Sequence, residues 1–169
     1  MNEIDELSDL PNIPSVYALC GGKQKNKTVS YVGCTKELHR RMEQHLIRHN
    51  SSITTGTSIV SLNPDLVTEV RWWSHERFIE KEFREAAKEI AFTVLEPELC
   101  SRKKSTKKSQ EMIDDEEFTQ EMQELFEREP SGTLHLDNFD DLRSKIRTLE
   151  NEVEKLKKIV SGLDIGIKK

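Results

Sequence analysis

The C-terminal part of this chain carries a 3.5-residue apolar repeat, a pattern that few structures can satisfy. The repeat consists of Leu142, Ile146, Leu149, Val153, Leu156, Val160 and Leu163. Leucine occupies every d position, and from Ile146 on a β-branched residue occupies every a position. This choice favours a parallel two-stranded coiled coil. The sequence therefore predicts a coiled-coil segment over residues 138–164 that pairs two copies of the chain as a homodimer.

The charges beside this repeat agree with a parallel pair. Lys145 at a g position would face Glu150 at an e position of the second copy, and Glu152 would face Lys157 in the same way. Both contacts join opposite charges across the seam. The alternative is a single amphipathic helix that packs on its own domain.

Aromatic residues show where a folded core is expected. Both tryptophans, both tyrosines and three of the six phenylalanines precede residue 100. Only 34% of the residues are hydrophobic and 34% are charged, so part of the chain must lie outside a core. We expect an N-terminal arm at 1–11, a globular domain at 12–100, a basic and polar linker at 101–115 and an acidic helix at 116–130.

The linker begins with a stretch, Ser101–Gln110, that contains no apolar residue and cannot bury surface. Its basic side chains, Arg102, Lys103 and Lys104 among them, could bind a phosphate backbone. They could equally act as a nuclear import signal in a eukaryotic source, or only keep the linker solvated.

Charge and cysteine usage narrow the class of protein. The net charge of −5 comes from an acidic C-terminal part after a nearly neutral N-terminal part, so it does not exclude DNA as a partner. Three cysteines without CxxC spacing argue against a disulfide framework or a zinc site. No stretch approaches the roughly 20 apolar residues of a membrane helix. We expect no membrane partner and a cytoplasmic, nucleoid-associated location, or a nuclear one in a eukaryote.

Apolar patterning in the globular domain predicts the element order β-β-α-β-α. The predicted elements are strands at Pro14–Cys20, Thr28–Cys34 and Val67–Trp73, helices at Lys36–His49 and Ser74–Leu95, and a short strand at Ser58–Leu62 as an option. The expected fold class is α+β, a small mixed β-sheet flanked by helices and followed by the linker, the acidic helix and the coiled coil.

Three short segments carry a family resemblance. They are Ser15–Tyr17 (SVY), Tyr31–Thr35 (YVGCT) and Leu38–Leu46 (LHRRMEQHL). In this order, on two strands and the next helix, they resemble the signature of the GIY-YIG nuclease superfamily over residues 12–100. Ser15 stands where the motif has its first glycine, which would strain the backbone if φ there were positive. The resemblance implies a GIY-YIG-like fold and hydrolysis of phosphodiester bonds in DNA.

The resemblance also implies roles for single residues. Tyr17 would assist proton removal from the attacking water, with Tyr31 beside it in the same hydrogen-bond network. Arg41 would clamp the scissile phosphate through its planar fork of donors. His45, one helical turn later, could contact the phosphate or the water. Gly33 is expected to permit close packing at the strand end.

Each of these residue types has a simpler interpretation when taken alone. Tyrosines on strands are usually half-buried packing residues, and exposed arginines or histidines on helices are usually solvated. Arg41, rather than Arg40, falls on the family arginine, while Arg40 and Lys36 are candidate DNA contacts. The assignment therefore depends on the four residues coming together in space.

A bound metal would need a carboxylate, which the resemblance places on the helix after the third strand. Mg²⁺, or another divalent cation such as Mn²⁺, is expected, with most of its ligands being water and phosphate oxygens. Counting back from Pro97 favours Glu89 as the catalytic and metal-binding glutamate, with Glu85 next and Glu82 third.

Three functions fit the sequence. A restriction-type or otherwise site-specific endonuclease would use its coiled coil to bring two sites to one duplex. A catalytically degenerate domain would bind nucleic acid or a partner without cutting. A repair or mobile-element nuclease would use the coiled coil to dock on another protein rather than on itself.

Overall fold

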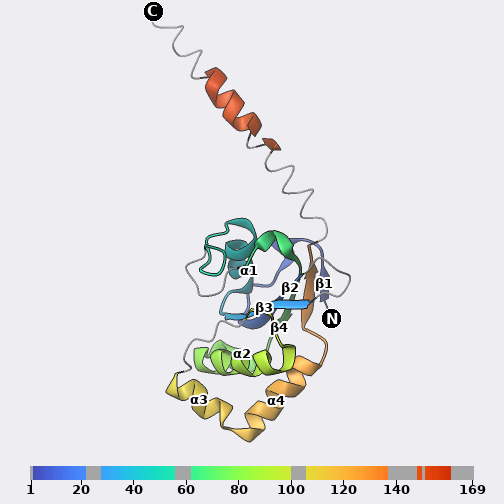
Figure 1. Ribbon diagram of the computed structural model, residues 1–169, viewed down its shortest axis with the longest axis vertical. Helices are drawn as coiled ribbons and strands as arrows, with labels where there is room; N and C mark the ends of the chain where they lie inside the picture. The colour runs from blue at the N-terminus through green and yellow to red at the C-terminus, as the bar shows by residue number, and fades with distance from the viewer. Residues whose placement is uncertain are drawn as a thin grey trace, which may run out of the picture. The chain divides into compact units, whose positions relative to one another are not determined.

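The computed structural model describes residues 2–21, 28–55, 62–99, 106–136, 148–149 and 151–160 of the chain. It divides the chain into two units, residues 1–136 and residues 137–169. The first unit is an α+β domain built on one mixed sheet (Figure 1). The predicted fold class is confirmed at this level.

The sheet has five strands in the order β1-β5-β4-β2-β3. The strands are β1 (Asn2–Ile4), β2 (Ser15–Gly21), β3 (Thr28–Thr35), β4 (Val67–Trp73) and β5 (Gly132–His135). Only the β1 and β5 pair is parallel, and the other three pairs are antiparallel. Strands β2, β3 and β4 confirm the three strands predicted from β-branched and aromatic runs, to within one residue at their ends.

Both ends of the first unit join the sheet, which the sequence did not predict. Strand β1 belongs to the segment expected to be an N-terminal arm at 1–11, and β5 lies 32 residues after the expected domain end at residue 100. The register pairs Asn2 with Gly132 and Ile4 with Leu134. The structure therefore extends the folded unit from residues 12–100 to residues 1–136.

The two faces of the sheet are covered by different helices (Figure 1). One face packs against α1 (Leu38–Met42) and a π-helical continuation, η2 (Glu43–Ile47). The other packs against α2 (Lys81–Leu95), which is backed by α3 (Lys107–Ile113) and α4 (Glu116–Glu127). Side chains of a strand alternate between faces, so each residue of β2 belongs to one layer only.

The α2 side of the sheet carries a hydrophobic core of its own. It contains Val16, Ala18 and Cys20 of β2 together with Ala86, Ala87, Ile90 and Ala91 of α2 and Phe118, Met122 and Phe126 of α4. Helix α4 confirms the predicted acidic helix at 116–130, because its apolar stripe at four-residue spacing is buried. Its first turn is capped by Asp115, whose carboxylate accepts hydrogen bonds from the backbone amides of Glu117 and Phe118.

Two predicted elements differ in extent. The helix expected at Ser74–Leu95 is interrupted at Glu80, between the 3₁₀ turn η4 (Glu76–Ile79) and α2. The Arg84 guanidinium donates to the carbonyls of Phe78 and Ile79, which end that turn. The linker expected at 101–115 also contains helix α3, capped at Thr106. Residues 58–61 of the optional strand lie outside the described residues.

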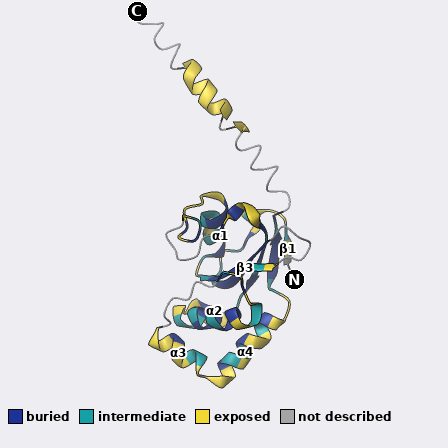
Figure 2. Ribbon diagram, viewed as in Figure 1, coloured by how far each residue is buried: buried dark blue, intermediate teal, exposed yellow. Residues whose placement is uncertain are grey.

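The second unit is described as helix over residues 148–149 and 151–160. Its apolar side chains are exposed between 49% and 60% and comprise Leu149, Val153, Leu156, Ile159 and Val160 (Figure 2). Leu142, Ile146 and Leu163 of the predicted seam lie outside the described residues. None of the helices in the described ranges is long and apolar enough to cross a membrane.

Candidate active site

Four of the predicted site residues meet on the α1 face of the sheet. The Tyr17 hydroxyl lies 2.8 Å from Nε2 of His45. Nε of Arg41 donates to the same hydroxyl at 3.5 Å. The Tyr31 ring lies beside both, tilted to Tyr17 and edge-on to His45, with its centroid 6.3 Å from each of theirs. The prediction that these residues share one place is therefore met by the fold.

Strand register explains why the two tyrosines are neighbours. Tyr17 pairs with Gly33 and Leu19 pairs with Tyr31 across the antiparallel β2 and β3 strands, so the tyrosines are diagonal partners on one face. A Cβ atom on Gly33 would lie 2.4 Å from the Tyr17 hydroxyl oxygen and 2.9 Å from a ring carbon of Tyr31. The absent side chain at Gly33 leaves the space in which both rings lie.

A widened helical turn sets the place of His45. The Arg48 amide donates to the Glu43 carbonyl at 2.8 Å, a five-residue step that replaces the four-residue step of an α-helix. His45 lies inside this turn and is fully buried, next to Leu46. Such turns are frequent at functional sites, and apolar spacing alone gave no indication of this one.

Burial keeps both partners of the central hydrogen bond neutral. Tyr17 and His45 are each 0% exposed. Burial, together with the positive charge of Arg41, lowers the pKa of His45 to about 3. Burial also raises the pKa of Tyr17 far above its ordinary value, with the neighbouring Tyr31 adding to the effect. At neutral pH the pair is a phenol and an uncharged imidazole.

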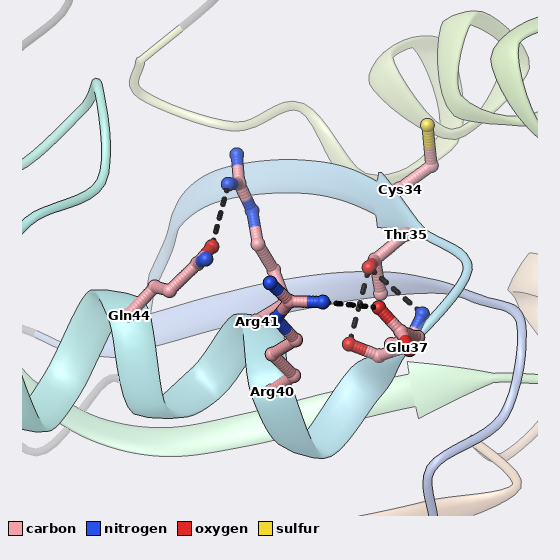
Figure 3. A pocket seen from close by; sticks show the side chains of 6 residues that line it. All are labelled: Cys34, Thr35, Glu37, Arg40, Arg41 and Gln44. Carbon is pink, nitrogen blue, oxygen red and sulfur yellow. Dashed lines mark hydrogen bonds and ion pairs between the residues drawn. The ribbon is translucent and has the colours of Figure 1, made fainter.

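A polar pocket of about 280 Å³ opens beside this group (Figure 3). It is lined by Cys34 and Thr35 from the end of β3 and by Glu37, Arg40, Arg41 and Gln44 from the first helix and its N-cap. Within it the Arg41 guanidinium donates to Oε1 of Gln44 at 3.1 Å. The pocket thus presents two guanidinium groups next to the buried phenol.

The two arginines in this pocket are held differently. Arg40 forms an ion pair with Glu37 at 3.2 Å, and its side chain is 66% exposed. Arg41 bonds to the buried Tyr17 and to Gln44. A bound anion would therefore meet Arg41 as an oriented donor and Arg40 as a mobile surface charge. Lys36, the other predicted DNA contact on this side, is exposed.

Ser15 does not disturb the first strand. It lies in regular strand β2, where it pairs with Thr35, and it is not among the described non-glycine residues with positive φ. Its hydroxyl donates to the Ile13 carbonyl at 3.3 Å. Replacement of the motif glycine by serine therefore costs no backbone strain.

The candidate glutamates lie on α2, the helix of the opposite face. The Glu89 carboxylate is 3.0 Å from the Lys88 ammonium and its side chain is 19% exposed. Glu85 pairs with Lys81 at 3.6 Å. Glu82 lies in the first turn of α2 and is half-buried. No hydrogen bond or ion pair within the described ranges joins any of the three to the residues around Tyr17.

The Cys34 thiol links the pocket to α2. Burial raises its pKa most, while the positive charge of Lys88 lowers it and the negative charge of Glu85 raises it. Cys34 lines the pocket together with Arg41 at the sheet edge. Glu85 is thus the candidate glutamate whose charge acts on a residue of the pocket.

A metal with several protein ligands does not fit this site. Among the residues that the structure describes, no three His, Cys, Asp or Glu side chains come together as a metal-binding group. A single carboxylate with water and phosphate oxygens is the arrangement that Mg²⁺ accepts. Glu85 and Glu89 are both paired with a lysine, but the Glu85 pair with the exposed Lys81 is longer, at 3.6 Å against 3.0 Å, and its charge acts on Cys34 of the pocket.

Three residues of the group were not predicted from the sequence. Ser51 is buried, and its hydroxyl lies 2.7 Å from Nδ1 of His45 and 2.9 Å from the Thr54 hydroxyl. Both belong to a polar segment after the helix, where the sequence carries no periodic signal. Gln44 is three residues after Arg41, so helical spacing could have placed it beside that guanidinium.

The predicted linker contacts, Arg102, Lys103 and Lys104, lie outside the described residues. Comparisons of this chain with protein-family models, with curated proteins and with solved structures find no match. The candidate site therefore rests on its own geometry and on the motif in the sequence.

Proposed function

We propose that this protein is a metal-dependent DNA endonuclease that hydrolyses phosphodiester bonds at the pocket around Arg41. The observation that carries the proposal is the bonded group of Tyr17, His45 and Arg41 beside a cationic pocket. These residues are separated by up to 28 positions in the sequence, and each matches a position of the GIY-YIG motif. Chance packing of strand aromatics would not require a guanidinium and an imidazole on the same phenol.

Phosphodiester hydrolysis needs charge compensation on the phosphate and a proton acceptor for water. Arg41 supplies the first, because its remaining N–H groups line the pocket and its direction is fixed by Tyr17 and Gln44. The neutral His45 and the Tyr17 hydroxyl supply the second. Arg40 and Lys36 extend the positive surface along which a DNA strand would lie.

Mg²⁺, or Mn²⁺ in its place, would be held by a single glutamate of α2, and Glu85 is the candidate whose charge acts on Cys34 of the pocket. Glu89, favoured by counting along the sequence, is the weaker ligand because its pair with the largely buried Lys88 is shorter than the pair of Glu85 with the exposed Lys81. The cation, when bound, would neutralise phosphate charge in the transition state. All other contacts to the phosphate come from the arginines.

Pairing through the C-terminal helix would give the enzyme two sites for the two DNA strands. The exposed apolar stripe from Leu149 to Val160 supports this part of the proposal, because it has no cover within the described part of its own chain. Opposite charges at Glu152 and Lys157 fit a parallel second copy. The restriction-type or site-specific mode of action follows from such a dimer.

One observation favours a second function, DNA binding without cleavage. Tyr17 and His45 are 0% exposed, so the proton acceptors lie behind Arg41 rather than on the pocket wall. In a binding module the same bonds would only orient Arg41 toward phosphate. Nuclease and binding module differ in whether water reaches the Tyr17 oxygen.

Nicking of supercoiled plasmid with Mg²⁺ or Mn²⁺ tests the proposal. We expect the wild-type protein to nick and Arg41→Ala to nick roughly 10²-fold more slowly, the effect of losing an oriented donor to a developing charge. Arg48→Ala is the matched control, because Arg48 is an exposed arginine near the same helix and pairs with Glu43. Wild-type protein that binds DNA through Arg41 but never nicks would establish the binding module instead.

A further inference from the structure

The hydrogen bonds behind Arg41 form a single series that ends in the segment after the helix. It runs from Arg41 through Tyr17, His45 and Ser51 to Thr54. The guanidinium Nε lies 3.5 Å from the Tyr17 hydroxyl, and the next three bonds measure 2.8, 2.7 and 2.9 Å. We call these five residues the Tyr17 series. Only Arg41, Tyr17 and His45 of this series belong to the proposed reaction.

The direction of the series can be derived from its two ends. A backbone carbonyl can only accept, so the Thr54 hydroxyl donates its one hydrogen when it bonds to the Ser51 carbonyl, 3.0 Å away, an acceptor that it shares with the Thr55 hydroxyl. The Thr54 oxygen must then accept from the Ser51 hydroxyl. Ser51 has no second hydrogen, so its oxygen accepts from Nδ1 of His45.

The other end gives the same direction. A guanidinium can only donate, so Arg41 occupies a lone pair of the Tyr17 oxygen and leaves the phenolic hydrogen available for another acceptor. A neutral imidazole whose hydrogen is on Nδ1 has a bare Nε2, which is that acceptor at 2.8 Å. The two ends therefore specify one tautomer of His45.

We infer that Ser51, held by Thr54, is a positioning residue that fixes His45 as the Nδ1–H tautomer, so that Nε2 accepts the Tyr17 proton. Resting on the proposed nuclease function, this gives the proton of the attacking water a defined path. The water O–H bond breaks as a new O–H bond forms on Tyr17. The original Tyr17 O–H bond breaks as an N–H bond forms on His45.

This path avoids a free phenolate at any stage. The products are a hydroxide for attack on phosphorus, a neutral Tyr17 and a doubly protonated His45. Burial disfavours both a phenolate at Tyr17 and an imidazolium at His45, so the two proton transfers must accompany attack of the hydroxide on phosphorus rather than precede it. The opposite tautomer would place a hydrogen on Nε2 facing the phenol, and the path would be closed.

The tautomer can be measured without any enzymatic activity. In ¹⁵N-labelled protein at neutral pH, long-range ¹H–¹⁵N spectra distinguish protonated from unprotonated ring nitrogens, and a His45→Gln variant assigns the signals among the five histidines. We expect a protonated Nδ1 and an unprotonated Nε2 for His45. The reverse pattern in wild-type protein would overturn the inference.

Variants of the hydroxyl residues test the cause. Ser51→Ala should shift His45 toward a mixture of tautomers, and Ser51→Thr, which keeps the hydroxyl, should restore the wild-type pattern. Thr54→Val, which removes the hydroxyl, and Thr54→Ser, which keeps it, make the same comparison at the residue that bonds to Ser51. They replace the Ser51 variants if Ser51→Ala does not fold. Ser52→Ala is an exposed neighbouring control that should leave the spectrum unchanged. Unchanged His45 shifts in folded Ser51→Ala or Thr54→Val would refute the role.

Nicking kinetics separate this inference from the proposed function. We expect Ser51→Ala to lower kcat by roughly 10²-fold with little change in KM, as for a lost proton acceptor rather than a lost DNA contact. Absence of nicking in wild-type protein with the expected tautomer would retain the positioning role and reject the nuclease. Normal kcat in a variant with altered tautomer would reject the proton path.

Discussion

A Cβ atom placed on Gly33 would lie 2.4 Å from the hydroxyl oxygen of Tyr17, closer than any side-chain carbon can approach. Gly33 faces Tyr17 across the β2 and β3 pair, and the phenol occupies the volume that a side chain would take. The glycine of the YVG segment thus determines how near Tyr17 lies to His45. Its role is spatial, since it lies in a regular strand.

Gly33→Ala should damage both the fold and the site. Overpacking of this kind costs about 1–3 kcal/mol of unfolding free energy, and the Tyr17 hydroxyl would have to shift away from His45. A displacement near 1 Å at a reacting group can slow catalysis by roughly 10²-fold. Urea unfolding gives the stability loss, and plasmid nicking normalised to the folded fraction gives the effect on the site.

Gly132→Ala is the matched comparison for this variant. Its Cβ would lie 2.1 Å from the Trp72 ring, so a similar loss of stability is expected by the same mechanism. Gly132 reaches Tyr17 only through Trp72, which pairs with both residues, so nicking per folded molecule should fall less than in Gly33→Ala. Equal losses of nicking in both variants would show that Gly33 acts only through stability.

The buried His45 should make the protein lose stability in acid. Its pKa is near 3 in the folded state and near 6.5 when unfolded, so below pH 6.5 the unfolded chain binds a proton that the folded protein refuses. The contribution of His45 to the free energy of unfolding should be fully present above pH 6.5. It should fall by about 1.4 kcal/mol for each pH unit from pH 6 toward pH 3. Urea titrations across this range measure the slope.

His45→Gln provides the reference for that slope. Glutamine stays uncharged, so the difference in unfolding free energy between the variant and the wild type should narrow as the pH falls. Parallel decline of both proteins would mean that other groups cause the acid sensitivity.

Replacement of the glutamates should distinguish the two candidates for the metal ligand. Glu85→Gln is expected to raise the Mg²⁺ concentration needed for nicking at least tenfold, because the proposed single carboxylate is lost. Glu89→Gln should change it less, since the Glu89 carboxylate is held closer to its lysine, at 3.0 Å against 3.6 Å for Glu85. Mg²⁺ titrations of the nicking rate, with the exposed Glu80→Gln as control, test this. If Glu89→Gln raises the required Mg²⁺ concentration more than Glu85→Gln does, the metal ligand is Glu89, as expected from the sequence.

Truncation after Leu136 should abolish dimerisation without unfolding the first unit. The cut follows the boundary between the two units, whereas a cut near residue 110 would remove α4 and β5. Light scattering should give a dimer for the full chain and a monomer for residues 1–136. Leu156→Glu in the full chain should also give a monomer, because it places a charge in the proposed seam.

A full-length chain that scatters as a monomer would remove the dimer from the proposal. The site around Arg41 would remain, and single-strand nicking would be its expected product. An exposed Lys158→Glu variant is a control for charge alone, since Lys158 lies outside the a and d positions.

Strand and helix prediction succeeded where the local pattern was strong. Strand β4 has the predicted bounds, and β2 and β3 differ by a single residue, because long β-branched and aromatic runs specify them locally. Strands β1 and β5 were missed. They are only three and four residues long and form by pairing with each other and with β4, information that a short window does not contain.

The candidate site was predictable in part for the same reason. Helical spacing put Arg41 and His45 on one face, and the motif tied them to Tyr17 and Tyr31. Ser51 could not be found, because its position depends on the widened turn at η2 and the chain that follows it. The glutamate prediction counted positions along α2 and stays a prediction, because both Glu85 and Glu89 form ion pairs with lysines that a count along the sequence does not include.

Strand β1 finds its partner about 130 positions further along the polypeptide, since Asn2 pairs with Gly132. During synthesis the β1 segment therefore cannot pair with β5 until almost the whole first unit has left the ribosome. Strand β5, the last to be synthesised, is the strand that pairs with β1, the first. The sheet can therefore be completed only after β5 has been synthesised. A nascent chain that stops before residue 132 would leave the β1 segment without the strand with which it pairs.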